Sequence, residues 1–81
     1  MAALTASQAR ELATRALAAI APEANLTAVG DDEGLREALD LDSMDFMNFV
    51  IALAEGSGRN IPEADTPKLR TMRGLVDYLA R

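Results

Sequence analysis

Apolar residues recur at helical spacing near both ends of the chain. In the first such segment Thr5 and Gln8 fit a capping box, and Pro22 marks where a helix must have ended. In the last segment Thr71 can cap a helix whose apolar residues stand at i, i+3, i+4 and i+7. The two predicted stripes are Ala9, Leu12, Ala13, Ala16, Leu17 and Ile20, and Met72, Leu75, Val76 and Leu79.

A third helix is predicted from Ser43 to about Glu55, and it is apolar on two sides. One stripe has the spacing of a core face: Phe46, Phe49, Val50 and Leu53. The second stripe consists of Met44, Met47 and Ile51. Burial of both stripes and a partner-binding role for the second are alternatives, and the two flexible thioether side chains favour a partner surface. Asp42 or Ser43 can cap this helix, and the run Gly56-Ser57-Gly58 closes it.

The segments between these helices are predicted to be short. Residues 22–33 are expected to form a loop anchored by Leu26 and Val29, and Gly34 to Leu39 a single helical turn. A short turn or helix is expected over about residues 63–70, with Thr66 and Pro67 as its N-cap and first position. We therefore predict an all-α fold: one domain over residues 1–81, a small four-helix bundle with three main helices and one short helix.

Composition and charge narrow the function. The 81 residues include no Cys and no His, which removes thiolate metal sites and the commonest general base, so we do not expect an enzyme. Residues 31–55 carry eight acidic side chains against Arg36 alone, which favours basic partners and argues against nucleic acid. Neither a signal peptide nor a bilayer-spanning stretch is visible, so a cytoplasmic location without membrane contact is expected.

The run Leu39-Asp40-Leu41-Asp42-Ser43-Met44-Asp45 resembles the attachment signature of acyl carrier proteins, D-L-G-x-D-S-[LM]-D. Two later runs, Asn60-Ile61-Pro62-Glu63 and Thr71-Met72…Val76-Asp77-Tyr78-Leu79, resemble the family's I-P-[DE] and T-V…I-D-Y-I segments. The resemblance continues without a gap from about Leu35 to Leu79, more than half of the chain.

The resemblance implies a non-catalytic carrier without a metal. In this family a phosphopantetheinyl transferase moves 4′-phosphopantetheine from coenzyme A onto the serine, here Ser43, flanked by Asp42 and Met44. The thiol of that arm would carry acyl groups as thioesters for fatty-acid, polyketide or other specialised lipid metabolism. A monomer is expected, whose partners are the transferase and acyl-activating or acyl-transferring enzymes with basic docking surfaces. The partner-binding candidates are Asp45, Met47, Asn48, Ile51 and Glu55.

Several residues depart from the family pattern. Ala38 and Asp40 stand where Asp and Gly are usual, and Phe46 replaces a small or polar residue. Ser57 replaces a core Phe, which suggests a looser helix end and an altered acyl pocket. Three helix positions that are commonly Glu are occupied by Asn48, Ala54 and Gly56. We therefore expect a specialised carrier dedicated to one pathway.

The same residues fit other functions less well. An EF-hand over residues 40–51 would need an oxygen ligand at Met44, Gly at Asp45 and Glu at Ile51, so it fails. A serine hydrolase built on Ser43 would lack both a histidine and a G-x-S-x-G turn. An aminoacyl or peptidyl carrier and a cofactor-free acidic helical interaction module remain as alternatives. The peptidyl-carrier motif more often reads G-G-x-S, so the Leu-Asp-Leu-Asp-Ser form favours an acyl carrier.

Overall fold

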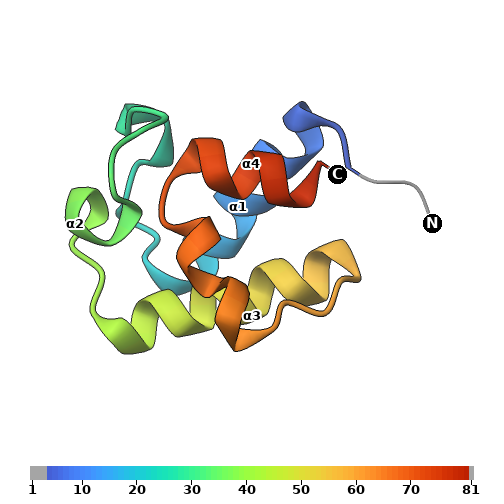
Figure 1. Cartoon of the computed structure of the whole chain (residues 1–81). Helices are drawn as coiled ribbons and strands as arrows, with labels where there is room; N and C mark the ends of the chain where they lie inside the picture. The colour runs from blue at the N-terminus through green and yellow to red at the C-terminus, as the bar shows by residue number, and fades with distance from the viewer. Residues whose placement is uncertain (1–3, 81) are drawn as a thin grey trace.

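The computed structural model describes residues 4–80, and every regular element within them is helical. The α-helices are α1 (Ala6–Ile20), α2 (Leu35–Leu39), α3 (Ser43–Ser57) and α4 (Met72–Leu79), and two 3₁₀ segments, η1 (Leu26–Ala28) and η2 (Glu63–Leu69), interrupt the connections. Helix α1 packs against both α3 and α4, and η2 packs against α4 (Figure 1). The all-α prediction is confirmed, with two short helices, α2 and η2, beside the three main ones.

Helix α1 begins and ends where the sequence predicts. The Thr5 hydroxyl accepts a hydrogen bond from the Gln8 backbone N–H at 3.1 Å, and the Gln8 side chain accepts one from the Thr5 N–H at 2.9 Å. This reciprocal capping box satisfies two N–H groups that the helix itself leaves unpaired. The helix stops at Ile20, two residues before Pro22.

The core between the helices is entirely apolar. No polar or charged side chain among the described residues is buried. Helix α1 contributes mainly alanines, whose small side chains let larger residues of α3 and α4 fill the space between the helices. The buried set is Ala9, Ala13, Ala16, Leu17, Leu26, Leu35, Leu41, Phe46, Phe49, Val50, Leu53, Leu69, Met72, Leu75 and Leu79.

The start of η2 differs from the prediction. Thr66 and Pro67 lie inside it, and the segment begins at Glu63, directly after Pro62. Asp65 N–H bonds the Pro62 carbonyl at 2.9 Å, and Arg70 N–H bonds the Pro67 carbonyl at 3.4 Å. Pro67 therefore lies inside η2, where its carbonyl accepts a hydrogen bond although it has no N–H to donate.

A polar contact joins η2 to α4. The Tyr78 hydroxyl donates a hydrogen bond to Asp65 Oδ2 at 2.8 Å, and Lys68 Nζ lies 3.2 Å from Asp65 Oδ1. The Tyr78 hydrogen bond, assisted by Lys68, lowers the pKa of Asp65, and the same hydrogen bond raises the pKa of Tyr78. Close by, Gly74 has no room for a side chain, because a Cβ there would overlap the carbonyl oxygen of Lys68.

The Tyr78–Asp65 contact predicts how stability depends on pH. The lowered pKa of Asp65 means a stabilising contribution that is present at neutral pH and lost as pH falls through the folded-state pKa. The raised pKa of Tyr78 means a contribution that is lost as pH rises beyond the ordinary tyrosine value of about 10. We expect Tyr78→Phe to lower the unfolding free energy at pH 7. Between neutral pH and either acid or alkaline pH, the unfolding free energy of this variant should fall by less than that of the parent chain. Urea unfolding followed by circular dichroism at acid, neutral and alkaline pH measures this. Parallel pH profiles for the two proteins would contradict the assignment.

Candidate functional site

The site begins in the two residues that separate α2 from α3. Asp40 closes α2 in the left-handed region with φ of 55°, and it is the one non-glycine residue with positive φ among those described. Its N–H and that of Leu41 both bond the Arg36 carbonyl, the latter at 2.9 Å, which completes the helix end. The family signature has glycine at this position because only glycine adopts this conformation without strain. Asp is among the residues that tolerate it best.

Asp42 caps α3. Its Oδ1 accepts a hydrogen bond from the Asp45 N–H at 2.7 Å, and its carbonyl accepts one from the Phe46 N–H at 3.0 Å. Of the two predicted caps the structure therefore uses Asp42, and Ser43 becomes the first residue of the helix. The consequence is chemical: the Ser43 hydroxyl is exposed at the helix start and is not used as the cap.

The surroundings of Ser43 suit a phosphate group. The backbone N–H groups of Ser43 and Met44 are in the first turn, where no helical carbonyl is available to them, and they form part of the positive end of the helix dipole. A phosphodiester on Ser43 could use these donors, so the residues present fit a phosphopantetheine arm. No group of three or more Asp, Glu, His or Cys side chains within residues 4–80 could hold a metal ion.

The predicted second stripe of α3 lies on the surface. Met44 is 71% exposed, Met47 45% and Ile51 49%, whereas the stripe on the opposite side of the helix is buried. Asn48 and Glu55 are also exposed, and Asp45 is half-buried. Burial of both stripes is therefore wrong: one face of the helix belongs to the core, and the other is an exposed apolar strip that begins beside Ser43. A partner-binding role for this strip stays a prediction.

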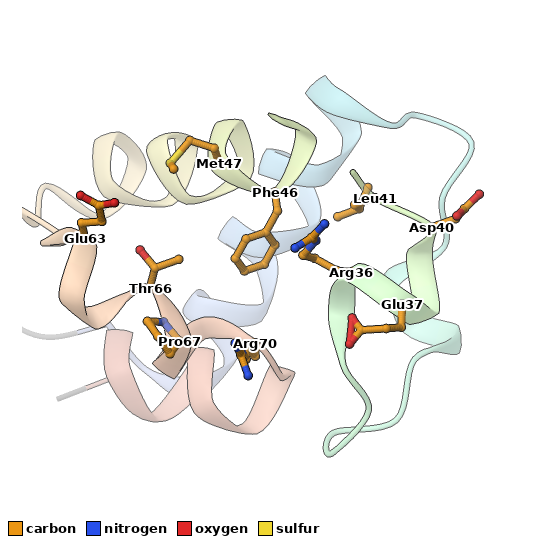
Figure 2. A pocket seen from close by; sticks show the side chains of 10 residues that line it. All are labelled: Arg36, Glu37, Asp40, Leu41, Phe46, Met47, Glu63, Thr66, Pro67 and Arg70. Atoms are coloured by element: carbon orange, nitrogen blue, oxygen red, sulfur yellow. The ribbon is translucent and has the colours of Figure 1, made fainter. Parts of the chain in front are cut away.

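A groove runs from this helix toward η2 and α2, and the sequence did not indicate it. Phe46 and Met47, one helical turn beyond Ser43, form one wall, and Thr66 and Pro67 form the facing wall (Figure 2). The remaining lining residues come from the ends of the groove: Arg36, Glu37, Asp40, Leu41, Glu63 and Arg70. The only earlier sign was the unusual Phe46, whose ring is buried and lies 6.3 Å from that of Phe49.

The far end of α3 is regular, in contrast to the looser end expected from Ser57. The helix continues through Ser57 and ends at Gly58, whose φ of 71° is readily adopted by glycine. The Ser57 hydroxyl donates to the Ala54 carbonyl at 3.3 Å and accepts from the Arg59 N–H at 3.3 Å. Arg59 in turn donates to the Tyr78 carbonyl at 2.8 Å. Hydrogen bonds therefore replace the apolar anchor that the family usually has there.

Comparison with known proteins gives a consistent class. No protein-family profile matches the chain. Curated relatives named "Acyl carrier protein" do match: one from Syntrophobacter fumaroxidans is 39% identical over 62 residues, 76% of this chain and 65% of the relative. Those from Rubrobacter xylanophilus and Lactobacillus johnsonii are 33% and 38% identical, over 63% and 59% of this chain and 63% and 60% of their own lengths.

These similarities agree with the helical fold and with the motif around Ser43. The chain is similar to acyl carrier proteins over 59–76% of its length. The matched region spans slightly less than two thirds of each of these relatives. Within the part of the chain that the structure describes, no helix is long and apolar enough to cross a membrane.

The strained residue ahead of the site gives a stability prediction. Asp40→Gly and Asp40→Ala remove the same carboxylate and differ only by a Cβ at a left-handed position. We expect the glycine variant to be more stable than the alanine variant by about 1 kcal/mol, because the Cβ clashes with the neighbouring carbonyl in this conformation. Chemical denaturation of both variants measures the difference. Equal midpoints would show that Asp40 is not held in the left-handed region in solution.

Proposed function

We propose that this protein is an acyl carrier in which Ser43 bears a 4′-phosphopantetheine arm. The observation that supports this most directly is that two neighbouring residues have different roles at the start of α3. Asp42 supplies the cap, so the neighbouring Ser43 hydroxyl stays exposed and available for modification. The proposal treats residues 1–81 as one carrier domain. An aminoacyl carrier would use the same site, and the cargo separates the two.

In this proposal the chain presents the arm and performs no turnover. The transferase would form a phosphodiester bond to Ser43 Oγ and break the pyrophosphate bond of coenzyme A, releasing adenosine 3′,5′-bisphosphate while the hydroxyl proton passes to a base of the transferase. The arm supplies a terminal thiol that holds acyl groups as thioesters. Asp42 keeps the first turn of α3 in place, and the first-turn N–H groups of α3 would be available as donors to the phosphate. Tethering raises the effective concentration of the thioester at a partner's active site.

The exposed strip of α3 is proposed as the docking surface for the transferase and for acyl-handling enzymes. Met44, Met47 and Ile51 supply apolar area next to the attachment point. Asp45 and Glu55 supply negative charge on the same helix, which suits partners with basic surfaces. Asn48, Ala54 and Gly56 stand where further acids are usual, so we propose a dedicated set of partners in one cytoplasmic pathway, with the carrier itself monomeric.

Attachment at Ser43 is tested by intact-mass measurement. The chain is incubated with coenzyme A and a phosphopantetheinyl transferase, and we expect the mass of one arm to be added. Ser43→Ala should add none, because it removes the attacking oxygen. Ser7→Ala, which changes an exposed serine of α1, should be modified like the parent chain. No added mass in the parent chain would favour the cofactor-free interaction module, and arm transfer to Ser43→Ala would place the site elsewhere.

The docking strip gives a kinetic prediction. Met47→Gln combined with Ile51→Gln should lower kcat/KM for arm transfer by about tenfold, since removal of central apolar contacts typically costs 1 kcal/mol or more. Both side chains are exposed, so the unfolding free energy should change by less than about 0.5 kcal/mol. Ala18→Gln, on an exposed position of α1, is the matched control and should leave transfer unchanged. Equal rates for the double variant and the control would remove this strip from the docking surface.

A further inference from the structure

Two arginines at one end of the groove have no partner within the described part of the chain. The side chains of Arg36 and Arg70 make no ion pair or hydrogen bond with any residue in 4–80. The other described basic side chains are engaged. Arg10, Arg15, Lys68 and Arg73 each pair with a carboxylate, and Arg59 bonds a backbone carbonyl. In a chain of net charge −5, two unpaired guanidinium groups beside one groove form a distinct feature.

The backbone holds the two arginines next to each other. The Leu35 N–H bonds the Arg70 carbonyl at 2.7 Å, so the start of α2 is tied to the segment that joins η2 to α4. Arg36 follows Leu35 directly, and both arginines line the groove (Figure 2). The backbone contact therefore brings together two exposed arginines that lie far apart in sequence.

The other residues that line the groove restrict the kind of ligand that can bind in it. Phe46 and Leu41 are buried and close the groove toward the core, so a ligand lies along the surface there. Glu63 is at the opposite end of the groove, and Glu37 and Asp40 line it near Arg36 without forming an ion pair with it (Figure 2). These acids weaken long-range attraction, so an anion must be held by direct hydrogen bonds. Guanidinium groups make such bonds to carboxylates and phosphates with two parallel N–H donors.

We propose that Arg36 and Arg70 bind an oxyanion carried by the arm. The oxyanion is the terminal carboxylate of a short acyl cargo or the phosphodiester of the arm itself. The inference builds on the proposed function, because an arm on Ser43 would start one helical turn from Phe46 and Met47, the residues of α3 that line the groove. If the arginines bind the carboxylate of the cargo, this carrier would be selective for acyl groups derived from short dicarboxylic acids. If they bind the phosphodiester, they would fix the direction of the arm.

The first experiment needs no arm and so is independent of the proposed function. The unmodified chain is titrated with inorganic phosphate and with succinate while the arginine Nε–Hε resonances are followed by NMR. We expect Arg36 and Arg70 to shift together and Arg15, which is paired with Glu11 on α1, to stay in place. Arg36→Gln combined with Arg70→Gln should abolish the response of nearby amides. Arg15→Gln should preserve it.

The second experiment separates the two sources of the oxyanion. Ser43 is loaded with the bare arm, and with arms ending in butyryl or succinyl groups through non-hydrolysable amide links, with loading verified by intact mass. Arginine shifts in the succinyl form alone support a carboxylate cargo, and equal shifts in all three forms support the phosphodiester. Shifts that survive in the double Arg→Gln variant, or arginine resonances that respond neither to free anions nor to any loaded form, would overturn the proposal. Failure of Ser43 to accept an arm would instead count against the proposed function and leave the free-anion result standing.

Discussion

The hydrogen bond from the Asp45 N–H to the Asp42 carboxylate is the contact on which the site depends. It fixes where α3 starts and leaves Ser43 at the first helical position with its hydroxyl exposed. If Ser43 were the cap, its hydroxyl would be occupied by the helix. The Asp42 cap therefore leaves the Ser43 hydroxyl exposed, three residues before Phe46, where the buried face of the helix begins.

Helix α3 serves two environments at once, and the arrangement around it explains how. Helix α1 covers one side with small alanines, and α4 adds leucines, so the whole core is apolar without a large contribution from the outer strip. The outer strip is therefore not needed to stabilise the fold. An exposed apolar strip of this kind costs solubility, and the acidic side chains of the central segment offset that cost through repulsion between molecules.

Local signals in the sequence were enough for the main helices, because each depends on contacts a few residues apart. The capping box of Thr5 and Gln8, the stop before Pro22 and the Thr71 cap of α4 were all predicted and are all present. Thr66 and Pro67 were wrongly predicted to start a helix, because the same pair of residues is also compatible with the inside of a 3₁₀ segment such as η2. The sequence could not distinguish Asp42 from Ser43 as the cap of α3, because the side chain of either residue can accept a hydrogen bond from a first-turn N–H. The groove could not be predicted at all, because its lining residues come from separate segments that tertiary packing brings together.

The departures from the family pattern acquire a physical meaning once the groove is seen. Two of these departures, Asp40 and Phe46, line the groove together with Arg36 and Arg70. Asp40 maintains a backbone conformation that glycine adopts more easily, and Phe46 places a large ring where the family has a small or polar residue. Phe46 contributes to the core, where its ring lies beside that of Phe49, whereas Asp40 is exposed and adds no core contact. Because the strained residue lines the groove and adds nothing to the core, its presence is better explained by a role at the proposed site than by stability.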